Sequence, residues 1–407
     1  MNKEQSFPRT YTNLQVLGAI CAILGALCLI PYASNLEQLY RGYLTGWVFL
    51  VSLSIGCLGL TLLQGMVRAQ WGVPVVRIYE AGAKILPLLG IASLPIVYAA
   101  FTHHLYPWAN PAEVAKDSVL RWRAPYMNAP FFFLRTIFYF LVLSWFAFQA
   151  VKLRRLQDET GDVLYENKLA SFSAPAFVFS VLLATFAITD WVMTLDKHWY
   201  STIYGFYFCI SSALTAHAFT VFLVCRQKIK GYAPYDKLIT PQRTKDLGNL
   251  MLVMTMVWAY FAVSQFIITW SGDLPYEIEF YLRRNTDFAF ATFTTFLVIF
   301  HFFVPFLLLL SGRTKRVPAL LAMTATIQFL ACLVDIVWNV EPMFHSLNAS
   351  FAAQFQGFLS YLGGFLLLGG LWLVLFVFNL RRNRLVPLYT AGLPTEVLET
   401  EVLQHAS

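Results

Sequence analysis

The sequence predicts an all-α membrane protein that crosses the bilayer ten times. Hydrophobic residues make up 58% of the chain and charged residues only 13%, whereas a soluble domain averages about 25% charged residues. The hydrophobic residues also gather into runs of about 20, the length of helix that spans the hydrocarbon core of a bilayer. Long apolar runs and few charges together predict a polytopic membrane protein without a sizeable soluble domain.

Each run is expected to be a helix, because backbone groups in lipid need hydrogen-bond partners within their own segment. The first run follows a polar N-terminus and has Pro31 and Tyr32 where a signal peptide would have small residues for cleavage, so we expect it to be retained. We place the ten spans at approximately 12–32, 43–66, 80–101, 130–151, 173–195, 204–225, 248–271, 287–311, 317–340 and 355–379.

The distribution of basic residues predicts the orientation of the chain. The N-terminus, the loops after spans 2, 4, 6 and 8 and the tail 380–407 hold 20 Lys and Arg residues, and the other loops hold 7. By the positive-inside rule, both termini and these basic loops are expected to be cytoplasmic. The net charge of +7 therefore reflects the loops. The basic clusters are mostly a signal of topology, with contact to membrane lipid headgroups as a second interpretation, and the charge does not indicate binding of nucleic acid.

The six cysteines form no C-x-x-C or C-x-x-C-H pattern. This argues against an iron–sulfur cluster, a zinc knuckle or a c-type haem on this chain.

A weak internal repeat links the fifth and ninth spans, in the segments ITDWVMTLDKHW (188–199) and LVDIVWNVEPMFH (333–345). Both segments have an acid near the outer end of the span, then a Trp, a second acid six residues after the first, and a His. These residues are Asp190, Trp191, Asp196 and His198 in the first segment, and Asp335, Trp338, Glu341 and His345 in the second. The repeat predicts two four-helix bundles, 43–195 and 204–340, flanked by the first and tenth helices.

Ionisable residues within membrane spans are candidate functional groups. Asp190 either exchanges protons or is a buried anchor that bonds the next helix through Tyr204 or Tyr207. Asp196 and His198 follow it at the outer surface, where they could continue a proton path.

Asp335 lies on a polar helical face together with Gln328 and Thr324, at a spacing of i, i+4 and i+11. Such a stripe either holds a chain of water molecules or joins neighbouring helices.

Two histidines lie near the middle of their spans, His217 in the sixth and His301 in the eighth. They could be the axial ligands of one b-type haem, hydrogen-bonded partners of neighbouring helices, or members of a proton relay, since imidazole titrates near neutral pH.

The cytoplasmic end of the third span carries Glu80 and Lys84 at i and i+4, a spacing that suits an ion pair. The pair is either a proton entrance or a self-neutralised helix start. Pro87 and Pro95 are expected to kink the same span. Arg135, in the fourth span, is expected to pair with an acid or to extend to the surface. The aromatic outer loop 102–129 is expected to pack on the membrane surface or on a partner.

The block TDWVMTLDKHWYSTIYGFY (189–207), the run HFFVPFLLLLSGRTKR (301–316) and the segment VDIVWNVEPMF (334–344) give the chain a family resemblance. Together with the ten spans, they resemble the ActF integral membrane subunits of bacterial alternative complex III, which belong to the NrfD/PsrC-like superfamily. The resemblance covers nearly the whole chain, and the D-W-x(4)-D-x-H-W-[YF]-S-T pattern is its most specific part.

The resemblance implies a location in the bacterial inner membrane and two four-helix bundles with no haem or cluster on this chain. Haem c and iron–sulfur clusters are expected on partner subunits, a multihaem cytochrome and an iron–sulfur protein, and quinol oxidation on an ActC-like subunit. The role implied for this chain is to support that subunit and to conduct protons, carried over mainly to Asp190, Asp196 and His198.

Two other functions stay open. The chain could be a quinol-binding anchor in its own right, which would need a pocket near Asp190, His198 and Trp199. It could also be a secondary transporter, which would usually show interrupted helices at matching positions of its two halves.

Overall fold

The computed structural model describes residues 9–285, 288–344 and 357–388, and the regular elements in this part of the chain are all helices. Ten spans are long and apolar enough to cross a membrane, which confirms the predicted number. Their bounds are Arg9–Tyr32, Leu36–Val67, Val76–Phe101, Ala129–Thr160, Val163–Leu195, Tyr204–Ile229, Pro241–Gly272, Phe290–Leu310, Pro318–Phe344 and Phe358–Arg381. The protein is therefore a multi-pass α-helical membrane protein.

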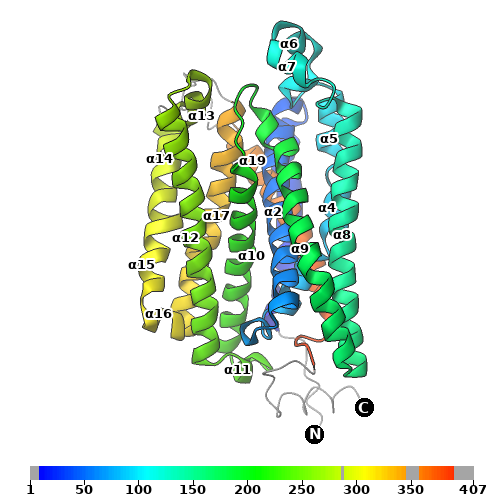
Figure 1. Cartoon of the computed structure of the whole chain (residues 1–407), viewed down its shortest axis with the longest axis vertical. Helices are drawn as coiled ribbons and strands as arrows, with labels where there is room; N and C mark the ends of the chain where they lie inside the picture. Colours follow the sequence, from blue (N-terminus) through cyan, green and yellow to red (C-terminus); the bar gives the residue numbers. More distant parts are fainter. Residues whose placement is uncertain (1–8, 286–287, 345–356, 389–407) are drawn as a thin grey trace.

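The spans form two four-helix bundles, and Figure 1 shows these two groups of helices beside each other. The first bundle contains α2 (Leu36–Val67), α3 to α5 (Val76–Ala83, Leu86–Ile91 and Leu94–Phe101), α8 (Ala129–Thr160) and α9 (Val163–Trp191). The second contains α10 (Tyr204–Ile229), α12 (Pro241–Gly272), α14, η5 and α15 (Phe288–Phe296, Leu297–Phe303 and Val304–Leu310) and α17 (Pro318–Val340).

Helices α2 and α10 join the two bundles through a close crossing. The hydroxyl groups of Ser52 and Ser212 are 2.8 Å apart across it. A Cβ atom on Gly56 would lie 1.9 Å from the carbonyl oxygen of Ser212, so only glycine allows the two backbones to approach this closely.

The first and last spans, α1 (Arg9–Leu29) and α19 (Phe358–Arg381), pack against each other and flank the bundles. Their backbones touch at small residues, where a Cβ on Gly25 would lie 2.1 Å from the nitrogen of Leu367. Arg381 donates to the hydroxyl of Thr12 over 3.1 Å, so the start of α1 and the end of α19 lie at the same end of the molecule. This is the end that carries the basic loops, and it is called the basic end below.

Several helices are longer than the hydrophobic runs that predicted them. Helices α2, α8 and α12 have 32 residues each, which corresponds to about 48 Å at about 1.5 Å per residue and exceeds a bilayer core of about 30 Å. The extra turns contain charged residues that stay helical because they have local partners. Arg155, for example, bonds Glu159 one turn later over 2.7 Å.

Two spans are interrupted. The third is divided into α3, α4 and α5 by breaks just before Pro87 and Pro95, which confirms the expected kinks. The eighth contains η5, a π-helix around His301 that the sequence did not indicate. The π-helix is a rare element that is frequent at functional sites.

The outer loop 102–129 folds into η3 (Pro107–Ala109), α6 (Pro111–Lys116) and α7 (Ser118–Arg123), at the top of Figure 1. Its aromatic residues pack on the end of α9 and on η4 (Met193–Leu195), which follows it. Trp108 donates to the hydroxyl of Thr194 over 3.0 Å, and Tyr106 donates to the carbonyl of Trp191 over 3.0 Å. The surface that this loop covers therefore belongs to its own chain.

Candidate functional site

Asp190 of the first bundle is buried and paired with a cation. Its carboxylate accepts from Nε of Arg135 over 2.7 Å and from the hydroxyl of Tyr139 over 2.9 Å, both on α8. The expectation that Arg135 pairs with an acid is confirmed. The expected contact of Asp190 with Tyr204 or Tyr207 is wrong, because these two tyrosines bond Asn339 and Asp335 of the second bundle.

The space beside Asp190 is filled by aromatic rings. The ring of Trp191 is 1% exposed and packs edge-on against Trp47, with centroids 4.8 Å apart. It also stacks on Phe140 at 5.4 Å. The outer half of the first bundle is therefore a closed aromatic core.

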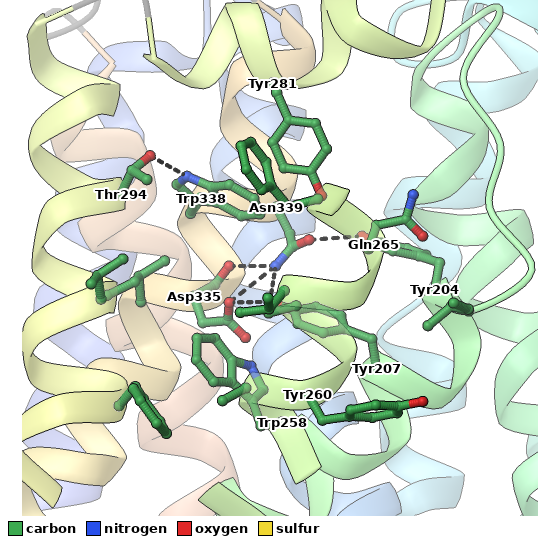
Figure 2. A pocket seen from close by; sticks show the side chains of 18 of the residues that line it. Tyr204, Tyr207, Trp258, Tyr260, Gln265, Tyr281, Thr294, Asp335, Trp338 and Asn339 are labelled. Atoms are coloured by element: carbon green, nitrogen blue, oxygen red, sulfur yellow. Dashed lines mark hydrogen bonds between the residues drawn. The ribbon is translucent and has the colours of Figure 1, made fainter. Parts of the chain in front are cut away.

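Asp335 of the second bundle has a different set of partners, of which Figure 2 shows Tyr207 and Asn339. Its carboxylate accepts from the hydroxyls of Tyr207 and, over 2.9 Å, Ser211, and from the amide of Asn339 over 3.3 Å. In the described chain no ion pair is found for this buried carboxylate, in contrast to Asp190. A buried carboxylate that is bonded only by neutral donors can hold or release a proton without breaking an ion pair.

Asp335 also lies on the wall of a cavity of about 710 Å³. The walls come from α10, α12, α13 (Pro275–Asn285), η5 and α17, and are mostly aromatic and aliphatic. Trp258 and Trp338 lie on two sides of the carboxylate in Figure 2. Trp199 lines the cavity, whereas Asp190 and His198 do not.

His301 and Gln328 form a buried group next to the cavity. The ring of His301 stacks on Trp258 with centroids 3.8 Å apart. Its Nδ1 lies 3.3 Å from the amide of Gln328, and its Nε2 lies 3.4 Å from the thiol of Cys332. Gln328, from the polar stripe of α17, thus joins this helix to η5.

His217 lies apart from His301 and bonds the first bundle. Its Nδ1 is 2.7 Å from the hydroxyl of Tyr79 on α3, and its Nε2 is 2.9 Å from the carbonyl of Leu247 on α12. Both ring nitrogens of each histidine therefore have protein partners. Axial ligation of a haem would require one of these contacts to break. The interpretation of both histidines as hydrogen-bonded partners of neighbouring helices therefore fits better than haem ligation.

The expected pair of Glu80 with Lys84 is replaced by a larger buried group at the basic end. The two oxygens of Glu80 accept from Arg77 over 2.7 Å and from Arg154 over 2.6 Å. Arg77 also pairs with Asp158, which accepts from the backbone nitrogen of Leu388 over 2.8 Å. The spacing of Glu80 and Lys84 was suitable, but arginines on two helices reach the carboxylate instead.

Asp196 and His198 belong to the loop after α9 and have local roles there. Asp196 accepts from the backbone nitrogens of His198 and Trp199 over 2.9 and 3.0 Å, which is the geometry of an Asx turn. The exposed imidazole of His198 lies 2.9 Å from Asp117, the N-cap residue of α7. These contacts fasten the outer loop, and His345 of the second repeat lies outside the described residues.

Several residues of the site were not singled out from the sequence. Asn339 follows Asp335 by one helical turn and bonds it, a spacing that could have been noticed. Arg284 could not be linked to the site from the sequence, because its partners are backbone carbonyls. Its guanidinium donates to the carbonyls of Trp338 and Asn339 over 3.0 and 2.9 Å. Burial lowers the pKa of Arg284 to about 9. It holds α13 over the end of α17 and so shapes the outer wall of the cavity.

Comparison of the chain with protein-family models and with curated protein sequences finds no match. In the described residues no three His, Cys, Asp or Glu side chains gather as a metal site.

Proposed function

We propose that this chain is a membrane subunit of a quinol:electron-acceptor oxidoreductase of the alternative complex III type, in which its second bundle conducts protons. The proposal takes the complex from the resemblance described above and the proton path from the site. It places the chain in the bacterial inner membrane with the basic end in the cytoplasm. The electron carriers, haem c and iron–sulfur clusters, would belong to partner subunits.

One observation carries the proton path. Asp335 is 0% exposed, is bonded by neutral donors, and borders the cavity, whereas its counterpart Asp190 is held by Arg135. An ion pair stabilises the charged form of an acid and opposes proton exchange. Of the two repeated acids, Asp335 is therefore the one suited to transfer protons.

Polar groups continue inward from Asp335 along α10. Ser211 bonds Asp335, and its carbonyl accepts from Thr215 one turn further on, over 2.7 Å. His217 and Tyr79 follow toward the basic end. Ordered water would complete such a path between Thr215 and His217, since buried polar sites hold water with two or more polar partners.

The interrupted helices weigh against the transporter alternative. The third span is the second helix of its bundle and the eighth is the third helix of its bundle, so the interruptions are not at matching positions. Repeat-based transporters place their broken helices at corresponding positions of each half.

The proposal is tested in two steps on the complex in native form. Purification through a tag on this chain should bring down c-type haem, an iron–sulfur subunit and a second multi-pass subunit. In proteoliposomes, Asp335→Asn should then slow proton transfer by about tenfold or more while quinol oxidation continues. Asp246→Asn, a partly exposed acid on α12 bonded to Gln242, is the matched control. A colourless, solitary protein would contradict the complex, and normal proton transfer in Asp335→Asn would contradict the path.

A further inference from the structure

A small polar void lies at the basic end of the first bundle, between α2, α8 and α9. Its volume is about 20 Å³, and a cavity needs about 10–15 Å³ to hold one water molecule. Its polar lining residues are Gln64 and Arg68 at the end of α2, Arg154 and Gln157 on α8, and Glu166 on α9. The void therefore has room for one water molecule and is too small for a phosphate or a lipid head group.

Two buried groups of this lining have no hydrogen-bond partner within the described residues. Gln64 is 5% exposed and Arg154 is 3% exposed. The Oε1 atom of Gln64 and the Nη2 atom of Arg154 are both buried and unbonded there. Buried polar groups in native proteins are nearly always hydrogen-bonded, either to protein or to ordered water. A donor and an acceptor beside one small void therefore indicate a bound molecule that can both accept and donate.

The orientation of the Gln64 amide is set by its surroundings. Its Nε2 donates to the carbonyl of Ala69 over 2.8 Å, a bond that the amide oxygen could not make. A Cβ on Gly72 would lie 1.9 Å from Cδ of Gln64, so the loop backbone packs directly against this side chain. On the other side of the void, Nε of Arg154 is bonded to Glu80 over 2.6 Å. Oε1 of Gln64 thus remains as an acceptor, and Nη2 of Arg154 remains as a donor.

The charges around the void select a neutral occupant. Arg154 is paired with Glu80, and the other two charged residues of the lining, Arg68 and Glu166, have opposite signs. A cation would face the donor of Arg154, and an anion would face the acceptor of Gln64, whereas water can satisfy both. We infer that the void binds one ordered water molecule that bridges Arg154 to Gln64 and so joins α8 to the end of α2. None of these residues belongs to the proposed proton path, so the site is independent of the proposed function.

Arg68 lies where the void borders the surface, since it is the exposed residue of the lining. Its Nη2 donates to the side chain of Asn167 over 2.9 Å and to the carbonyl of Glu166 over 3.3 Å. These bonds fasten the end of α2 to α9 and cover the void. The backbone of Arg68 has a φ of 54°, in the left-handed region that favours glycine. Arg68→Gly therefore suits the backbone and removes only the cover.

Radiolytic hydroxyl labelling in native membranes that contain the protein tests this site. A water molecule that X-rays split oxidises the side chains that it touches, so a buried side chain is labelled where it lies against bound water. Leu169 lines the void and is 2% exposed, whereas Leu143 on α8 is 0% exposed and lies outside the lining. We expect about tenfold or more label on Leu169 relative to Leu143, because bulk water reaches neither side chain. Equal labelling of the two leucines would overturn the inference and indicate a dry void or a bound ion.

Three variants test the bridge and its cover. Gln64→Leu removes the acceptor and should lower the labelling of Leu169 by about threefold or more, since a buried water needs two or more polar partners. Gln149→Leu, a matched change on α8 outside the lining, should leave it unchanged. Unchanged labelling in Gln64→Leu would contradict a water held by this residue. In Arg68→Gly, heavy oxygen from added labelled water should appear on Leu169 after shorter mixing times than in the wild-type protein, and equal times would contradict the role of Arg68 as a cover.

Discussion

The guanidinium of Arg135 lies 2.7 Å from the carboxylate of Asp190, within the outer half of the first bundle. Both side chains are almost fully buried, at 8% and 0% exposed. The rings of Tyr126 and Phe131 lie 3.8 and 4.5 Å from the guanidinium and shield it further. Asp335 has no such cation in the described chain, so the two repeated acids differ in chemistry although their sequence motifs are alike.

Removal of one member of this pair should be costly. Arg135→Met leaves the charge of Asp190 buried without its partner, and we expect a loss of about 3–5 kcal/mol in the free energy of unfolding. The double variant Arg135→Met with Asp190→Leu removes both charges and should recover most of this loss. Unfolding in mixed micelles measures all the variants. Additive effects of the two substitutions would contradict a coupled pair.

The buried group at the basic end gives a comparison between adjacent arginines. Arg154 is 3% exposed and bonds Glu80, whereas the side chain of Arg155 is 70% exposed and pairs with Glu159 at the surface. Arg154→Met should destabilise the protein by about 3–5 kcal/mol, because Glu80 loses a partner in the interior. Arg155→Met should change stability by less than about 1 kcal/mol.

The same unfolding measurement distinguishes the two arginines. Equal effects of the two substitutions would show that Glu80 is accessible to water, which would favour the earlier reading of this region as a proton entrance. A large difference would assign Glu80 and its arginines to the stability of the bundle.

Hydrophobic runs and prolines predicted the spans and the breaks of the third span because both signals are local. A helix in lipid needs only its own residues to satisfy its backbone, and a proline disrupts the helix that contains it. The partner of a buried acid is not a local property. Glu80 had a suitable residue four positions later, yet its carboxylate is bonded by Arg77 and by Arg154, which comes from a different helix.

The internal repeat illustrates the same limit at the site. Trp191 and Trp338 occupy similar places in the two motifs, but Trp191 fills the first bundle and Trp338 lines a cavity. The difference depends on neighbouring helices, since Trp47 and Phe140 close the first bundle. The π-helix at His301, which lies outside the repeat, was likewise not indicated by the sequence.

The outer loop should respond to acid. Hydrogen bonding and the charge of Lys197 lower the pKa of Glu113. Burial raises the pKa of Asp117, but the backbone nitrogens of Leu120 and Val119 and the charge of His198 outweigh it, so this pKa is also lowered. A lowered pKa in the folded state stabilises the docked loop above the ordinary value of about 4, and this stabilisation is lost as pH falls through the lower, folded value.

Hydrogen exchange of residues 110–123 measures this response. We expect protection at neutral pH and a loss of protection below about pH 4, after correction for the intrinsic exchange rate. Asp117→Asn should already loosen the loop at neutral pH and weaken the acid response. The adjacent span α8 serves as an internal reference, and parallel loss of protection in α8 would indicate general acid unfolding instead.

The contact between the two bundles can be tested with two glycines on one helix. Gly56 faces α10, where an added Cβ would lie 1.9 Å from the carbonyl oxygen of Ser212, whereas a Cβ on Gly59 would meet nothing within 4 Å. Gly59→Ala should be neutral or stabilising by up to about 1 kcal/mol, because alanine favours the helix. Gly56→Ala should force α2 and α10 apart and destabilise the protein by about 1–3 kcal/mol. Since Ser211 beside this crossing bonds Asp335, Gly56→Ala should also slow proton transfer in proteoliposomes, and Gly59→Ala should not. Equal stability of the two variants would contradict the close crossing that positions the site.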